Sequence, residues 1–204
     1  MNILSELHLD ALSEVFNVGA GRAAASLSEI VGDEVRLSVP SVEIRKSSEI
    51  DLSVMGLRGE RFGAVHQTFT GSFEAEAILL FTEEHALEIV RDMMGSQISL
   101  EELAEFEQEA MCELGNIILN ACLSAMADML SIPMNCSLPD YSVASTDEIL
   151  RRVNNEDINQ SYLLLLHIDL AIEKRRSEGH LIFLLSSTSL KDLIIQIERF
   201  LGEI

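Results

Sequence analysis

The sequence lacks several features that mark common classes of protein. Its 204 residues include no tryptophan, three prolines, three cysteines, and 14 basic side chains against 34 acidic ones. It has no glycine-rich phosphate loop followed by lysine and no GxSxG motif, so the usual signatures of nucleotide binding and serine hydrolysis are missing. The net charge of −20 argues against nucleic acid or anionic membranes as partners, and favours protein partners or simple solubility.

The cysteines and histidines show no spacing typical of metal ligands. Cys112, Cys122 and Cys136 form no CxxC pair and cannot all pair with one another, which indicates reduced core residues. The five histidines are scattered, so no metal site is predicted. No apolar run reaches the ~20 residues that span a bilayer, and the start MNILSELHLD has no basic residue of a signal peptide. We therefore expect a cytoplasmic protein without a membrane segment.

What the sequence does contain is the same series of elements twice. Each half predicts a long helix, a strand that ends near a proline, a two-stranded hairpin and a further helix. A capping box of Ser99 and Glu102 opens the second long helix, and a Ser189 cap is expected to open the last helix. The second half adds a short helix after Ser145. The long helices are expected over about residues 5–31 and 100–130. Strands are expected at 35–39, on both sides of a turn at 71–72, at 134–138, and at 162–172 and 180–186 around a polar turn.

A shift of 99 residues superimposes the two halves. Among the residues that recur at matching places are Glu14 and Glu113, Asn17 and Asn116, and Pro40 and Pro139. Such a repeat implies two equivalent structural units, and neither half alone would bury enough surface to fold. The prediction is a single α+β domain over residues 1–204, with a pseudo-two-fold repeat of about 1–99 and 100–204. Its two long helices are expected to pack side by side on an antiparallel sheet.

The repeated glutamate and asparagine lie three residues apart, so they are neighbours on one helix face. A single Glu-x-x-Asn pair is ordinarily a solvated helix surface. Asparagine is a poor helix former, however, and each copy is followed after 22 residues by one of the chain's three prolines. We expect both pairs to face solvent, opposite the apolar residues of each helix. The small residues 19–21 allow either close approach of a partner or tight helix packing.

The two motifs resemble those of the CheC family of chemotaxis phosphatases, whose relatives include CheX and FliY. The first reads D-x3-E-x2-N-x22-P from Asp10, and the second reads E-x3-E-x2-N-x22-P from Glu109. The resemblance extends over essentially the whole chain. Two departures from the family pattern are Phe16, where glycine is usual while the second copy keeps Gly115, and Glu109 in place of Asp or Ser.

The resemblance implies hydrolysis of the aspartyl phosphate of a CheY-type response regulator. Mg²⁺ and a lysine inside the receiver domain would compensate the phosphoryl charge, so this chain would need no cofactor of its own. Asn17 and Asn116 would orient the attacking water, because a carboxamide both donates and accepts hydrogen bonds. Glu14 and Glu113 would bind the receiver lysine. The second site is expected to be the stronger, since Gly115 would leave room where Phe16 would crowd the partner.

The alternative is a non-catalytic adaptor that binds the receiver, or the deamidase CheD, in the chemotaxis or flagellar switch system. Two asparagines favour the phosphatase, since a pure binder has no need of both. The sequence leaves open whether CheD binds and which receiver is the substrate. A monomer is expected, because one chain already carries both motif copies.

Overall fold

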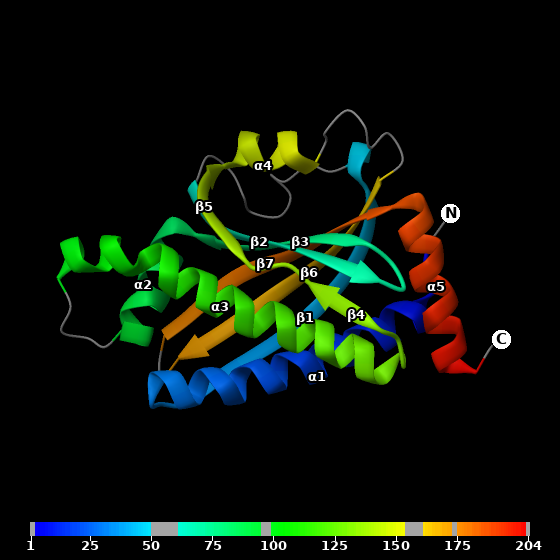
Figure 1. Cartoon of the computed structure of the whole chain (residues 1–204), viewed down its shortest axis with the longest axis horizontal. Helices are drawn as coiled ribbons and strands as arrows, with labels where there is room; N and C mark the ends of the chain where they lie inside the picture. The colour runs from blue at the N-terminus through cyan, green and yellow to red at the C-terminus, as the bar shows by residue number, and fades with distance from the viewer. Residues whose placement is uncertain (1–2, 50–60, 95–98, 154–160, 173–174, 203–204) are drawn as a thin grey trace.

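The computed structural model describes residues 3–49, 61–94, 99–153, 161–172 and 175–202 (Figure 1). Over these ranges it confirms an α+β fold, with five α-helices and one antiparallel sheet of seven strands. The helices are α1 (Glu6–Val31), α2 (Glu83–Met94), α3 (Leu100–Met129), α4 (Thr146–Val153) and α5 (Ser187–Leu201). The strands are β1 (Val35–Lys46), β2 (Arg61–Gly71), β3 (Ala75–Thr82), β4 (Met134–Cys136), β5 (Asp140–Ser145), β6 (Ser161–Ile172) and β7 (Arg175–Ser186).

Local capping signals set the ends of the two long helices. The Ser5 hydroxyl accepts a hydrogen bond from the His8 backbone N–H at 3.2 Å, and α1 ends at Gly32 with φ of 75°. The predicted capping box of Ser99 and Glu102 opens α3. Both helices therefore lie where the sequence predicts them, and Figure 1 shows them side by side on the sheet.

The last helix begins three residues earlier than predicted. Its N-cap is Ser186, whose hydroxyl accepts a hydrogen bond from the Ser189 backbone N–H at 3.0 Å. Ser189, the predicted cap, is buried, and its hydroxyl accepts from the Glu74 backbone N–H at 3.3 Å. Ser186 is both the last residue of β7 and the N-cap of α5, so no loop separates the strand from the helix. The sequence pattern around residue 189 does not indicate this.

The two halves of the chain exchange strands within the sheet. Its order is β1-β6-β7-β3-β2-β4, and β5 also pairs with β2. The first strand of the first half, β1, thus joins the β6–β7 hairpin of the second half. Conversely, β4 and β5 of the second half join the β2–β3 hairpin of the first half. The strands of either half are therefore not all neighbours in the sheet.

Pro40 marks an extra residue in β1 rather than the end of the strand. Ser38 pairs with Asp169 and Ser41 pairs with His167, so three steps along β1 face two steps along β6. This is a β-bulge, which suits proline because its residue donates no ladder hydrogen bond. The strand predicted at 35–39 therefore continues through the bulge to residue 46.

Pro139 marks the same irregularity in the second half. Cys136 pairs with Phe69 and Asp140 pairs with His66, so four steps along this segment face three steps along β2. Here the strand divides into β4 and β5, and the sequence predicted only the first of these. The polar turn predicted before residue 180 is also shorter than expected, because β7 already begins at Arg175.

The main core lies between the sheet and the helices α1 and α3. Phe16 of α1 is fully buried and stacks on Phe183 of β7, with ring centroids 5.5 Å apart. Cys122 is buried as predicted, and burial raises the pKa of its thiol to about 12. Cys136 is exposed, so the expectation of three core cysteines is wrong for this residue. A smaller cluster on the opposite face includes Ile149 of α4.

One stretch of α3 resembles a membrane span in length and composition alone. The stretch runs from Phe106 to Met129, and 56% of its most apolar window is buried inside the fold. It packs against α1 and the sheet, which accounts for its apolar character.

Candidate functional site

The first Glu–Asn pair lies on the exposed side of α1. Glu14 and Asn17 are both exposed, while Leu12 and Phe16 of the same helix face the core. The carboxamide of Asn17 nevertheless has a structural partner in β1. Its Nδ2 donates to the Val39 carbonyl at 3.1 Å, and its Oδ1 accepts from the Val39 N–H at 3.0 Å.

These two hydrogen bonds explain the spacing of 22 residues between asparagine and proline. Val39 lies in the bulge, where its N–H and carbonyl have no ladder partner on β6. Asn17 satisfies both groups, and the donor and acceptor on Val39 fix which way the amide is turned. The side chain therefore fastens β1 to α1 as well as facing solvent.

The second pair, on α3, has the same position but different bonds. Glu113 is exposed and Asn116 is half-buried. The Asn116 Oδ1 accepts a hydrogen bond from Asn120 Nδ2 at 2.6 Å, and Asn120 Oδ1 accepts from the Cys136 thiol at 3.0 Å. Among the described residues, no bond joins Asn116 to Leu138, which is the residue equivalent to Val39.

The bulge beside the second pair also exposes an apolar side chain. Val39 is 2% exposed, whereas Leu138 is 89% exposed. The neighbouring Pro139 carbonyl accepts a weak hydrogen bond from the Cys112 thiol, with the sulfur 3.9 Å from the oxygen. Burial and the negative charge of Asp140 raise the pKa of Cys112, so this thiol stays protonated as a donor.

The structure contradicts the reason for expecting a stronger second site. Gly115 is buried against the sheet, where an added Cβ would lie 2.4 Å from Val65 Cγ1. Phe16, the equivalent residue, is likewise buried against Phe183. Both positions point away from solvent, so neither leaves room for nor crowds an incoming partner. The glycine serves close packing of α3 on β2.

The small residues after the first pair divide between two roles. An added Cβ on Gly19 would lie 2.8 Å from the Cys122 Cα, so this glycine lets the two long helices approach closely. Ala20 is buried. Gly21 is exposed and has nothing within 4 Å of an added Cβ. Helix packing, one of the two readings of this segment, therefore accounts for residues 19 and 20.

Alanine at the two asparagines should affect stability very differently. Asn17→Ala leaves the N–H and carbonyl of Val39 without partners, and is expected to lower the free energy of unfolding by about 1–3 kcal/mol. Asn116→Ala breaks no bond to the backbone, and should change it by less than about 0.5 kcal/mol. Urea unfolding followed by circular dichroism measures both values. Equal effects would contradict the different bonding of the two side chains.

Comparison with known proteins places each motif inside a family match. The family model described as Chemotaxis phosphatase CheX matches residues 64–161, and the CheC-like family model matches residues 7–44. The first match contains Glu113 and Asn116, and the second contains Glu14 and Asn17. These matches confirm the resemblance that the motifs indicate.

Individual relatives agree with the family matches. The CheY-P phosphatase CheC of Bacillus subtilis (strain 168) is 24% identical over 145 residues, which are 70% of this chain and 69% of that protein. The flagellar motor switch phosphatase FliY of the same organism is 25% identical over 151 residues, 71% of this chain but 38% of that protein. Thermotoga maritima FliY has the same fold, with a TM-score of 0.78 at 20% identity over 97% of this chain and 99% of that structure.

Proposed function

Because this chain resembles the CheC, CheX and FliY group, we propose that it hydrolyses the aspartyl phosphate of a CheY-type receiver domain. The observation that carries the proposal is the pair of outward-facing Glu–Asn motifs at equivalent positions of α1 and α3. Each motif lies within a match to a family of this group, and one matched relative is named a CheY-P phosphatase.

The proposed reaction relies on charge that the substrate protein supplies. Hydrolysis of an acyl phosphate needs an in-line water and compensation of the phosphoryl charge, and a receiver domain provides the latter with Mg²⁺ and lysine. This chain would then need no cofactor for the reaction. Its asparagines would hold the water. An acidic protein could then act on an anionic phosphoryl group, because the receiver domain supplies the positive charge.

The two asparagines offer the water different hydrogen-bonding capacity. The Asn17 Nδ2 donates to the Val39 and Ser13 carbonyls, at 3.1 and 2.9 Å, so both of its N–H groups are used. What remains is one lone pair on Oδ1, which can accept a hydrogen from the attacking water. Within the described ranges Asn116 uses its Oδ1 alone, so its Nδ2 can also donate. Site one would hold water rigidly, and site two would contact both water and phosphoryl oxygen.

The glutamates are suited to dock the receiver lysine. Both carboxylates are exposed, and in the described part of the chain neither Glu14 nor Glu113 is in an ion pair. An incoming ammonium group would form a charge-assisted hydrogen bond with either. At site two, the exposed Leu138 would add an apolar contact that site one lacks.

Removal of the docking charge should weaken binding of the receiver. Glu14→Gln together with Glu113→Gln is expected to raise the dissociation constant for the phosphorylated receiver at least about tenfold, the value of a charge-assisted hydrogen bond. Glu29→Gln is the matched control, because Glu29 is an exposed carboxylate of α1 outside the motif. Binding is measured by calorimetry with a beryllofluoride-activated receiver. An equal loss in the Glu29 variant would point to net charge instead.

The function itself is tested by the decay of a ³²P-labelled phospho-receiver at saturating Mg²⁺. A phosphatase accelerates the decay when present in less than molar equivalence, whereas an adaptor binds the receiver and leaves the decay rate unchanged. The adaptor is the second candidate, because one relative is a protein of the flagellar motor switch. A cytoplasmic location and a monomer carrying both sites complete the proposal, and sedimentation tests the monomer. CheD is a further partner to test by pull-down.

A further inference from the structure

Two adjacent strands place four titratable side chains together on the sheet face opposite the long helices. On β6 and β7, His167 pairs with His180 and Asp169 pairs with Glu178. Alternate residues of a strand point to the same face, so these four form a block of two neighbouring cross-strand rows. Leu166 and Ile168, the residues on either side of His167 in β6, belong to the core under α1 and α3.

The distances in this block fit the coordination of a metal ion. The His167 Nε2 lies 3.4 Å from Asp169 Oδ1, and one ligand atom from each of His167, Asp169 and Glu178 lies within 4.8 Å of the others. A tetrahedral zinc ion with bonds of about 2.1 Å places its ligand atoms ~3.4 Å apart. Because both carboxylates are exposed, side-chain rotation alone can close the remaining gap.

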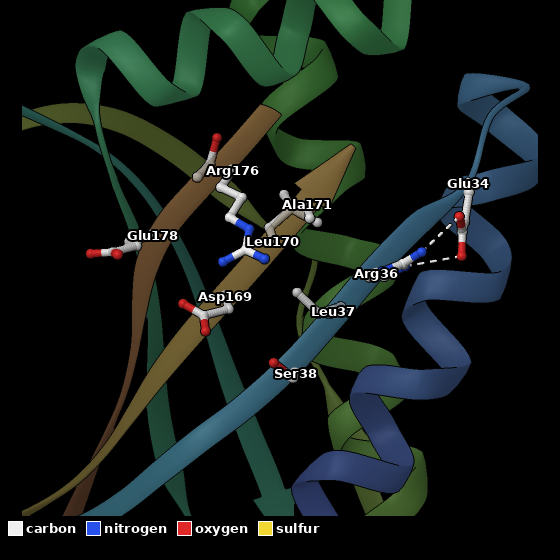
Figure 2. A pocket seen from close by; sticks show the side chains of 10 residues that line it. Glu34, Arg36, Leu37, Ser38, Asp169, Leu170, Ala171, Arg176 and Glu178 are labelled. Atoms are coloured by element: carbon white, nitrogen blue, oxygen red, sulfur yellow. Dashed lines mark hydrogen bonds and ion pairs between the residues drawn. The ribbon is translucent and has the colours of Figure 1, made fainter. Parts of the chain in front are cut away.

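Asp169 and Glu178 share their cavity with Arg176, but among the described residues no ion pair joins Arg176 to either carboxylate. Carboxylates directly opposite each other on paired strands repel. Arg176 lies in the next row, opposite Ala171, and Arg36 is bound to both carboxylate oxygens of Glu34 at 3.0 and 3.1 Å (Figure 2). Over the described ranges, neither Asp169 nor Glu178 has an ion pair with lysine or arginine. A cation between them would remove the repulsion.

His180 holds the ring of His167 in position. The His167 Nδ1 lies 3.4 Å from His180 Nε2, and the two rings meet edge to face with centroids 5.1 Å apart. When Nδ1 donates this hydrogen bond, the lone pair of His167 Nε2 faces Asp169. A histidine that binds a metal ion is oriented in this way by a partner at its other nitrogen.

We propose that His167, Asp169 and Glu178 form a binding site for a divalent transition metal ion such as Zn²⁺, with His180 as a positioning residue. Imidazole and carboxylate together suit this class of ion. Asp169 and Glu178 also line an adjoining cavity of about 600 Å³, which gives solvent access to the remaining coordination positions. The site is on the other face of the sheet from the Glu–Asn motifs and does not depend on the proposed phosphatase activity.

The test is calorimetric titration of the whole chain with Zn²⁺, without any receiver present. We expect one ion per chain, and a rise of the thermal midpoint with Zn²⁺ because the ion binds the folded state. Asp169→Asn and Glu178→Gln keep the shape of each side chain, and each should weaken binding at least about tenfold. His167→Ala should abolish it. Co²⁺ in place of Zn²⁺ should give absorption bands that the His167 variant lacks.

Two control variants separate this site from other ligands. Glu43→Gln removes a carboxylate of β1 that pairs with Arg45, and should bind Zn²⁺ as the wild type does. Cys136→Ser removes an exposed thiol, and should also leave binding unchanged. The proposal would be overturned if the chain did not bind Zn²⁺. It would also be overturned if binding survived in the double variant Asp169→Asn with Glu178→Gln, or if it were lost in Cys136→Ser.

Discussion

Replacement of Asn17 and Asn116 together by alanine is expected to abolish the acceleration of receiver dephosphorylation, a loss of roughly 10²-fold in the added rate. A carboxamide that orients water acts on the transition state, so binding of the phosphorylated receiver should be nearly unchanged. Each single variant should remove the contribution of its own site, since the two side chains lie on separate helices. The measurement is the decay of labelled phospho-receiver at saturating Mg²⁺.

The control for this experiment must allow for the structural role of Asn17. Because Asn17→Ala also frees the backbone of Val39, activity is compared with that of Gly19→Ala, which is expected to be destabilised while both asparagines remain. Circular dichroism at the assay temperature establishes that each variant is folded. A double asparagine variant that accelerates decay as well as the wild type would exclude the carboxamide mechanism and favour the adaptor.

Two glycines of α1 should respond to alanine with opposite signs. Gly19→Ala places a Cβ 2.8 Å from the backbone of Cys122, which can yield only if α1 and α3 separate. We expect this change to lower the free energy of unfolding by about 1–3 kcal/mol. Gly21→Ala meets no neighbour, and the better helix propensity of alanine should raise the free energy of unfolding by about 0.5–1 kcal/mol.

The pair of variants is informative because both carry the same gain in helix propensity. The difference between them therefore isolates the close approach of the two long helices at Gly19. Urea unfolding of both variants beside the wild type measures the effect. If Gly19→Ala proved as stable as Gly21→Ala, the contact between α1 and α3 would be looser than the structure describes.

Local signals in the sequence were sufficient to locate the two long helices. The Ser99 and Glu102 capping box and the left-handed Gly32 act within one turn of a helix end, so their effect can be read without knowledge of the fold. The resemblance to the CheC family was likewise carried by short motifs and is confirmed by the family matches. The positions of Glu14, Asn17 and Glu113 on exposed helix faces follow from helical periodicity.

Features that depend on distant partners could not be predicted in the same way. The sequence does not indicate which strand pairs with β1, so the exchange of strands between the halves could not be predicted. The bonds from Asn17 to Val39, and the packing of Gly115 against Val65, require the helix to be placed on the sheet. His167 and Glu178 lie close together only because β6 pairs with β7. The spacing of the histidines in the sequence therefore could not indicate a metal site.

Because the halves exchange strands, the segment whose strands are all neighbours in the sheet is not one of the two sequence halves. Residues 61–153 contain β2, β3, β4 and β5, which are all neighbours in the sheet, together with the helices α2, α3 and α4. The CheX family model matches this stretch, at residues 64–161, and not either half of the sequence repeat. A fragment with these bounds would have β3 as the free strand at which β7 normally pairs.

Two copies of such a fragment could pair through their β3 strands, related by a two-fold axis. The β3 strand of one copy would then take the place that β7 has beside β3 in this chain. Two covalent links, from β1 to β2 and from α4 to β6, thus join blocks of the sheet that could otherwise be separate subunits. A circular permutant that begins at β2, when cut between α4 and β6, would turn the pairing of β3 with β7 into an interface between two subunits, and every strand pairing in the sheet would stay the same.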